Sequence, residues 1–247
     1  MSNEQKKTCA FIGLGVMGYP MAGHLQAAGH ATTVYNRTTA KAEAWVDEHE
    51  GVAAATPGQA ATAGEVVLVC VGNDDDLRSV VFGPEGILSG MSVGSVLVDH
   101  TTASAEVARE IAAAAAQQGV GFVDAPVSGG QAGAETGQLS VMCGGSEETF
   151  ASVETILEVY AKAVNLIGPV GAGQTTKMVN QICIAGLIQG LSEALDFGRR
   201  ADLDMDKVLA AISQGASGSW QMSNRSSTML ARDFDHGFAL DWMRKDL

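Results

Sequence analysis

Gly13-Leu14-Gly15-Val16-Met17-Gly18 is the stretch that decides the fold of this 247-residue chain. The apolar run Cys9-Ala10-Phe11-Ile12 precedes it, and a helix-like segment over residues 22–28 follows it. A G-x-G-x-x-G sequence between a strand and a helix lets the backbone approach a pyrophosphate at the helix N-terminus. Residues 13–18 are therefore predicted to form a dinucleotide-binding βα turn in which all six residues contact the cofactor.

Short apolar segments alternate with helix-forming segments between residues 8 and 167. The segments predicted as strands are residues 8–12, 31–35, 66–71, 96–99 and 121–124, with weaker signals at 139–143 and 164–167. Alanine-rich stretches such as 103–118 lie between them, and alanine is the best helix former. This alternation is typical of an α/β protein with a Rossmann-type, doubly wound and mostly parallel sheet.

The strand signals stop after Gly168-Pro169. Residues 171–200 are predicted as one long helix, which at ~1.5 Å per residue spans roughly 40 Å. Its end carries the basic pair Arg199-Arg200, which suits a helix C-terminus. Residues 206–213 and 219–230 are predicted as further helices. We therefore expect two domains, a Rossmann domain over 1–167 and an all-helical domain over 168–247.

The composition excludes several function classes. Lys and Arg number 15 against 28 Asp and Glu, which gives a formal charge of -13 and argues against a nucleic-acid partner. The polar N-terminus and the short apolar runs predict neither a signal peptide nor a membrane span. Cys9, Cys70, Cys143 and Cys183 have no metal-type spacing. We expect no metal site, and buried, reduced thiols in a cytoplasmic protein.

Two further loops are expected at the cofactor. Ligands of doubly wound sheets bind beyond the carboxyl ends of the strands. Val71-Gly72-Asn73 begins at the last residue of one predicted strand and His100-Thr101-Thr102 follows another, so they should converge with residues 13–18.

The end of the second strand bears on the choice of cofactor. An NAD site usually places Asp or Glu there, to hold the ribose 2'-hydroxyl, whereas this chain has Asn36-Arg37-Thr38. Arg37 can supply a charged fork for a 2'-phosphate, and Asn36 and Thr38 can add neutral donors. The sequence thus favours NADP(H), with NAD(H) as a second cofactor. The alternative is that Arg37 is a solvated charge and Asn36 a turn residue.

Three more segments resemble the signatures of a known family. They are Asp124-Ala125-Pro126-Val127-Ser128-Gly129-Gly130, Gly171-Ala172-Gly173-Gln174-Thr175-Thr176-Lys177-Met178-Val179-Asn180 and Lys245-Asp246-Leu247. Together with the glycine-rich turn they resemble, in order and across essentially the whole chain, the β-hydroxyacid dehydrogenases, the 3-hydroxyisobutyrate dehydrogenase family. The resemblance implies hydride transfer between a nicotinamide cofactor and a short 3-hydroxy or 2-hydroxy acid, or its semialdehyde.

The same segments supply candidate substrate and catalytic residues. Ser128-Gly129-Gly130 follows a strand, and its hydroxyl and uncovered backbone N–H groups can cradle a carboxylate, a role that the resemblance also implies. The alternative is an ordinary tight turn. Lys177 and Asn180 share one helical face. The resemblance makes Lys177 the general acid or base and Asn180 a substrate-binding residue, although a lysine early in a helix is by itself more often a solvated charge.

The resemblance extends to the cofactor and to the C-terminus. It implies that Thr101 and Thr102 match the position that contacts the nicotinamide ribose and that Lys245 reaches the cofactor near the nicotinamide. By composition, Arg244-Lys245 equally suits a basic helix flank. Family members usually continue beyond the Lys-Asp-Leu motif, so we expect an incomplete helical domain at Leu247. The expected partners are a small carboxylic acid and, as in many relatives, further copies of the chain in a homodimer or tetramer.

Three other functions remain open. A decarboxylating dehydrogenase of the 6-phosphogluconate type shares the architecture, but its relatives carry His where this chain has Val179 before Asn180. A dinucleotide-binding module without catalysis needs no proton-transfer lysine. An imine reductase is possible on the same fold, but the resemblance places Lys177 with the alcohol-oxidising members.

Overall fold

The structure is a computed structural model that describes residues 6–234 and 240–246. Residues 1–5, 235–239 and 247 lie outside the described residues, and Leu247 of the Lys-Asp-Leu motif is one of them. The chain divides into two compact units, Met1–Lys177 and Met178–Leu247.

The described strands of the first unit form one sheet with the order β3-β2-β1-β4-β5-β6-β8-β7, in which β9 pairs with β8. Their bounds are β1 (Thr8–Ile12), β2 (Ala31–Tyr35), β3 (Val52–Ala53), β4 (Val66–Val69), β5 (Val96–Asp99), β6 (Gly121–Asp124), β7 (Val127–Ser128), β8 (Leu139–Gly144) and β9 (Ala161–Gly168). Strands β1 to β6 pair in parallel, while β8 is antiparallel to β6 and β7. The Rossmann-type, mostly parallel fold expected from the sequence is confirmed.

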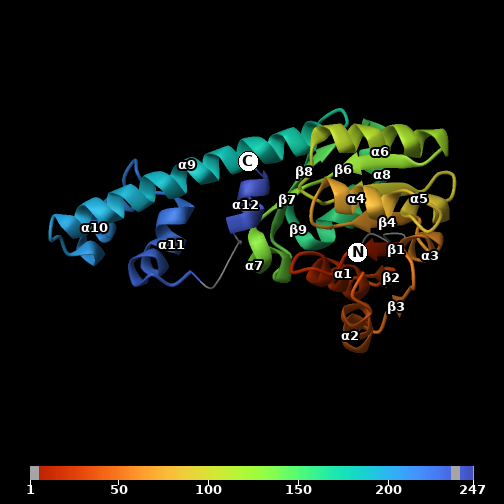
Figure 1. Cartoon of the computed structure of the whole chain (residues 1–247), viewed down its shortest axis with the longest axis horizontal. Coiled ribbons are helices and arrows are strands. Elements are labelled where there is room, and N and C mark those ends of the chain that lie inside the picture. Colours follow the sequence, from red (N-terminus) through yellow and green to blue (C-terminus); the bar gives the residue numbers. More distant parts are fainter. Residues whose placement is uncertain (1–5, 235–239, 247) are drawn as a thin grey trace. The chain divides into compact units, whose positions relative to one another are not determined.

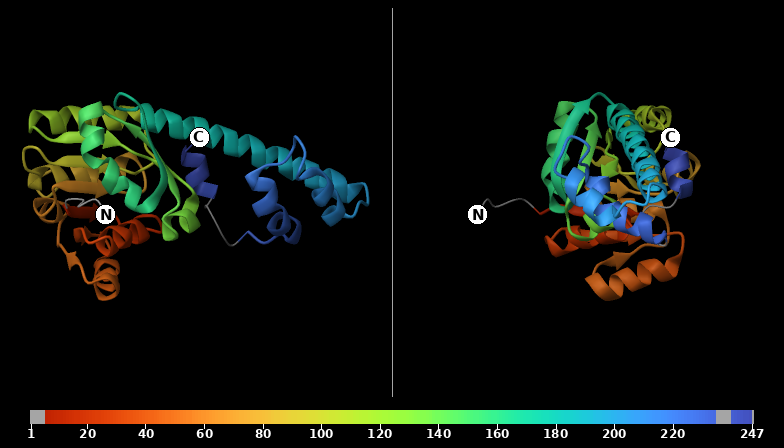
Figure 2. Two further views of the ribbon diagram at one scale, coloured as in Figure 1. Left: turned by 180° about the vertical axis from the view of Figure 1, so that it is seen from behind. Right: turned by 90° about the vertical axis from the view of Figure 1, so that its left-hand side faces the viewer.

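Helices cover both faces of this sheet (Figures 1 and 2). They are α1 (Gly18–Ala27), α2 (Thr39–His49), α3 (Pro57–Thr62), α4 (Asp74–Val81), α5 (Ile87–Gly90), α6 (Ala105–Gln117), α7 (Gly130–Glu135) and α8 (Glu147–Leu157). Alternate residues of β1 point to opposite faces: Phe11 packs in a core with α1, α2 and α8, and Ile12 in a core with α3 to α6. Burial on both faces explains why Cys9 to Ile12 of β1 and the whole of β4 are continuous apolar runs.

The second unit is helical. Helix α9 (Ala172–Arg200) begins in the first unit and continues into the second, where α10 (Met205–Ile212), α11 (Trp220–Ala231) and α12 (Leu240–Asp246) follow. Leu191 and Leu195 of α9 pack with Met222 of α11 and with apolar residues of α10. A Cβ at Gly198 would lie 2.6 Å from the sulfur of Met205, so glycine permits the close approach of α10. Among the described helices, none is long and apolar enough to cross a membrane.

Most predicted elements match the structure within a few residues. The strand predicted at 66–71 ends earlier, at Val69, because the Val71 N–H donates to the Thr101 hydroxyl instead of to a neighbouring strand. The two-residue strands β3 and β7 were not predicted.

The prediction that all four cysteines are buried is wrong for Cys183, which is exposed, and Cys70 is only partly buried. Cys183 lies two residues after Gln181, about 200° around α9, and Gln181 is on the buried face of that helix.

Candidate active site

The three glycines of the turn between β1 and α1 have different structural roles. Gly13 has a φ of +98°, and a Cβ there would overlap the carbonyl oxygen of Cys70. A Cβ at Gly18 would overlap the carbonyl oxygen of Gly13, so this glycine allows α1 to pack on the strand. Gly15 has nothing within 4 Å of its Cβ position, which leaves open space over the backbone. This division of roles fits a pyrophosphate approaching Gly15 at the N-terminus of α1.

The residues of the turn differ in their exposure to solvent. Val16 and Gly15 are exposed and Met17 is half-buried, whereas the Leu14 side chain is buried in the core. Leu14, Gly15 and Val16 line one surface hollow, together with residues of α1, α2 and α7. This hollow lies over the segment predicted to hold the dinucleotide.

The segment after β2 joins the glycine-rich turn. The Asn36 Oδ1 accepts a hydrogen bond from the Leu14 N–H at 2.9 Å, and the Asn36 Nδ2 donates to the Thr38 carbonyl at 3.0 Å. Asn36 therefore holds the two loops together. The Arg37 side chain is 86% exposed, and its Nη1 lies 3.4 Å from the Asp76 carboxylate of α4. Thr38 is the exposed N-cap residue of α2.

The loops after β4 and β5 meet as expected. The Val71 N–H donates to the Thr101 Oγ1 at 3.1 Å, and the Thr101 N–H donates to the Asp99 Oδ1 at 2.9 Å. Asn73 caps α4, because its Oδ1 accepts from the Asp76 N–H. Gly72 lies between these residues and is half-buried. The predicted cofactor residues Val71, Asn73 and Thr101 thus occupy the carboxyl ends of neighbouring strands.

Two buried carboxyl groups end neighbouring strands of the sheet, Asp99 on β5 and Asp124 on β6, which pair in register. Burial raises the pKa of Asp99 to about 7, against the lowering effect of its hydrogen bonds from Thr101. Burial also raises the pKa of Asp124, against the hydrogen bonds it accepts from the Gly171 and Gln174 backbone. Neither position was assigned a role from the sequence.

His100, the first residue after β5, is buried and neutral. Burial lowers its pKa to about 4. Its Nδ1 lies 2.6 Å from the Ala125 carbonyl, and its Nε2 lies 2.8 Å from the Tyr160 hydroxyl. A neutral ring that donates from Nδ1 and accepts from Tyr160 satisfies both contacts. His100 therefore serves to hold β5, β6 and the segment before β9 together.

Helix α9 starts at these buried groups. The Asp124 Oδ1 accepts from the Gly171 N–H at 2.7 Å, and its Oδ2 accepts from the Gln174 N–H at 2.9 Å. The Gln174 amide bonds the backbone on both sides of Thr102. Lys177 follows within the same unit, and its side chain is buried, at 7% exposure. Lys177 and the cofactor loops therefore belong to one hydrogen-bonded framework.

The candidate carboxylate cradle lies at the end of β7. Ser128 pairs with Ser140 of β8, and Gly129 and Gly130 follow with φ values of +135° and +62°. Both glycines are exposed, and a Cβ at Gly130 would meet nothing within 4 Å. Positive φ at two successive residues explains why glycines stand here.

The remaining predicted site residues belong to the second unit. There the Asn180 Nδ2 donates to the Gln181 Oε1 at 2.9 Å, and the Gln181 Nε2 donates to the Asp246 Oδ2 at 2.7 Å. The Lys245 Nζ lies 2.8 Å from the Asp246 Oδ1. This chain of contacts ties α12 to α9, and links Asn180 to Lys245 through Gln181 and Asp246.

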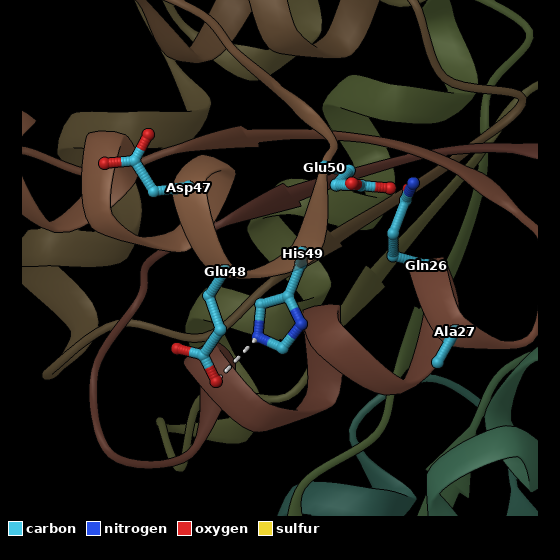
Figure 3. Close-up of a pocket in the computed structure, with 6 residues that line it drawn as sticks. All are labelled: Gln26, Ala27, Asp47, Glu48, His49 and Glu50. Atoms are coloured by element: carbon cyan, nitrogen blue, oxygen red, sulfur yellow. Dashed lines mark ion pairs between the residues drawn. The ribbon is translucent and has the colours of Figure 1, made fainter.

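A second surface hollow lies away from these loops, at the C-terminal ends of α1 and α2 (Figure 3). Asp47, Glu48 and Glu50 line it, and the His49 Nε2 lies 3.7 Å from Glu48. Three carboxylates would repel an anionic cofactor or substrate, so we assign it no part in the site. Among the described residues, no group of three His, Cys, Asp or Glu side chains is arranged to hold a metal ion.

Two family models match the chain. Residues 8–168 match the NAD binding domain of 6-phosphogluconate dehydrogenase. Residues 171–247 match the NAD-binding domain of NADP-dependent 3-hydroxyisobutyrate dehydrogenase.

Individual proteins match over nearly the whole chain. An uncharacterized oxidoreductase of Shewanella frigidimarina is 60% identical over 96% of this chain and 82% of its own length. A probable 3-hydroxyisobutyrate dehydrogenase-like protein of Arabidopsis thaliana is 44% identical over 96% of this chain and 71% of its own length. The crystal structure of 3-hydroxyisobutyrate dehydrogenase from Salmonella typhimurium superimposes with a TM-score of 0.85 at 30% identity, covering 98% of this chain and 84% of that one.

Proposed function

The chain belongs to the β-hydroxyacid dehydrogenases of the 3-hydroxyisobutyrate dehydrogenase family, and we propose that it interconverts a short 3-hydroxy or 2-hydroxy acid with its semialdehyde or keto acid. The family expected from the four sequence motifs is confirmed. The chain is accordingly an oxidoreductase, and its cofactor is a nicotinamide dinucleotide. We further propose that NADP(H) is preferred and that Lys177 is the general acid or base.

The burial of Lys177 is the observation that carries this proposal. Lysine is almost never fully buried unless it is paired, so the burial of Lys177 sets it apart from a solvated charge early in a helix. The helix around it is fixed to the strand ends that bear Thr101 and Asp124, where a Rossmann fold binds its ligand.

In the proposed reaction the bound nicotinamide supplies or accepts the hydride. Lys177 gives a proton to the carbonyl oxygen during reduction and takes the hydroxyl proton during oxidation. Ser128 and the backbone N–H groups of Gly129 and Gly130 hold the substrate carboxylate, and Asn180 orients the substrate. Arg37 binds the 2'-phosphate that distinguishes NADPH from NADH.

Replacing the lysine tests the proton-transfer role. Lys177→Met keeps the length and apolar character of the buried stem but removes the ammonium group. We expect kcat to fall by roughly 10²- to 10⁴-fold, the usual contribution of general acid–base catalysis, with NADPH affinity retained. The assay is NADPH oxidation with succinic, methylmalonic and tartronic semialdehydes and with glyoxylate.

Lys162→Met is the matched control, because Lys162 is an exposed lysine on β9. It should retain the wild-type kcat. A folded Lys177→Met protein with wild-type kcat would contradict the role of Lys177. Release of carbon dioxide during turnover would favour the decarboxylating alternative, and turnover of imines but not of carbonyl acids would favour an imine reductase.

A further inference from the structure

The side chain of Gln174 is wholly buried and bridges two elements of the first unit. Its Oε1 accepts a hydrogen bond from the Ala103 N–H at 3.0 Å, and its Nε2 donates to the Thr101 carbonyl at 2.7 Å. One amide therefore satisfies a buried donor and a buried acceptor in the segment that follows β5. A buried backbone group left without its partner is destabilising, so this bridge is a strong constraint.

The backbone of Gln174 is fixed as well. Its N–H donates to the Asp124 carboxylate, which also accepts from the Gly171 N–H. A Cβ at Gly173 would lie 2.9 Å from the Asp124 Oδ2, and one at Gly144 would lie 2.5 Å from the Oδ1. Glycines at these two positions give the carboxylate room to reach the N-terminal turn of α9. The start of α9 is thus held from two strand ends.

The other end of the bridge is the predicted cofactor loop. Thr101, whose carbonyl accepts from Gln174, donates its own N–H to Asp99, and its hydroxyl accepts from the Val71 N–H. The loops after β4 and β5 therefore share this one threonine. Any movement of α9 along its axis would have to break the contacts of Gln174 with this loop.

Lys177 lies three residues after Gln174, on the neighbouring position of the same helical face. Both side chains are buried. We infer that Gln174 is a positioning residue of the proposed reaction: its amide fixes the turn of α9 that bears Lys177 against the loop that bears Thr101. This inference rests on the proposed function, because the position of Lys177 matters to turnover only if Lys177 transfers the proton.

Gln174→Met tests the bridge at nearly unchanged side-chain length. The thioether makes neither strong hydrogen bond, so the turn loses its fixed distance from the loop. Misplacement of a reacting group by about 1 Å can cost roughly 10²-fold in rate. We expect a 10- to 100-fold lower kcat per folded molecule, and faster hydrogen exchange of the Ala103 N–H. Gln26→Met is the control, since the Gln26 Oε1 accepts from the Thr32 N–H, outside the site; it should leave kcat unchanged.

The Gln174→Glu variant provides a second test, through the pH dependence of its kcat relative to that of the wild type. The new carboxyl accepts from the Ala103 N–H at any pH, but it donates to the Thr101 carbonyl only when protonated. Burial raises the pKa of such a carboxyl. The kcat of Gln174→Glu divided by that of the wild type should therefore rise at least several-fold as the pH falls from 8.5 to 5.5.

A double-mutant cycle separates this inference from the proposed function. If Gln174 acts through Lys177, Gln174→Met should lower kcat in the wild type but not further in Lys177→Met. Equal losses in both backgrounds, or wild-type kcat in Gln174→Met while Lys177→Met is impaired, would overturn the positioning role and leave the function standing. Wild-type kcat in Lys177→Met would instead reject the proton-transfer role itself, and the inference with it.

Discussion

Arg37 and Asp76 set the electrostatics of the proposed 2'-phosphate site. The Arg37 Nη1 lies 3.4 Å from the Asp76 Oδ1, and Asp76 stands in the acidic first turn of α4. A phosphate bound by Arg37 would compete with this carboxylate for the same guanidinium. The neighbouring acids have other partners: Asp74 accepts from the N–H and the hydroxyl of Ser104, and Asp75 lies 3.7 Å from Arg78. Asp76 is therefore the acid of this turn whose charge bears on the phosphate.

Asp76→Asn should raise the preference for NADPH. An exposed ion pair is worth about 0–1 kcal/mol, so the ratio of kcat/KM for NADPH to that for NADH should rise by about two- to five-fold. Initial rates with both cofactors measure this ratio.

Asp75→Asn is the matched control for that measurement. Its side chain is 98% exposed, and the substitution removes the same charge from the same helical turn. It should change the ratio much less. Equal shifts in the two variants would show that net charge matters and the Arg37–Asp76 pair does not.

At the scale of the element, the β1–α1 turn makes opposite predictions for two of its glycines. Gly15→Ala places a methyl group in open space, so the midpoint of urea unfolding should stay near that of the wild type. The methyl would occupy the space that a pyrophosphate needs, and NADPH affinity should fall at least about 10-fold, since each 1.4 kcal/mol is a factor of ten. Fluorescence titration with NADPH measures the affinity.

Gly18→Ala serves as the contrasting variant in the same turn. Its methyl would overlap the Gly13 carbonyl oxygen and approach the Phe11 ring at 2.9 Å. Overpacking of this kind costs typically 1–3 kcal/mol, so the unfolding midpoint should fall. Wild-type NADPH affinity in a folded Gly15→Ala protein would refute the assignment of this turn to the pyrophosphate.

The elements that the sequence predicted share a physical property. Strands β1, β2, β5 and β6 were predicted with the bounds that the structure shows, because short segments rich in strand-forming residues between turn residues carry a local signal. Strands β3 and β7 have two residues each, too few for any periodicity. Their pairing with β2 and β8 depends on the tertiary structure and cannot be inferred from their own residues.

The features of the candidate site also divide into local ones, which the sequence predicts, and long-range ones, which it does not. The glycine-rich turn over 13–18 and the segment 171–180 that contains Lys177 are local patterns, so both could be identified from the sequence. The bridge made by Gln174 joins positions 71 and 73 residues apart, and Asp124 binds backbone groups 47 and 50 residues away. Asp99 and Asp124 each stand at the end of an apolar run, a polar interruption that the sequence shows, and Asp124 also begins one of the segments that resemble the family.

The net charge of the whole molecule is unfavourable for binding the proposed ligands. The chain has a formal charge of -13, while a dinucleotide phosphate and a hydroxy acid are both anions. General electrostatic attraction therefore cannot supply the affinity. In our proposal, binding depends instead on local donors, namely the N-terminus of α1, Arg37, the backbone of Gly129 and Gly130, and Lys177.

The most direct test of this account is the initial rate of oxidation of NADPH, and then of NADH, by the 247-residue chain with the semialdehydes and glyoxylate named above. We expect turnover of at least one of these carbonyl acids, with a higher kcat/KM for NADPH than for NADH. NADPH binding without turnover of any of them would contradict the proposed activity and favour a dinucleotide-binding module, and faster turnover with NADH would contradict the role of Arg37.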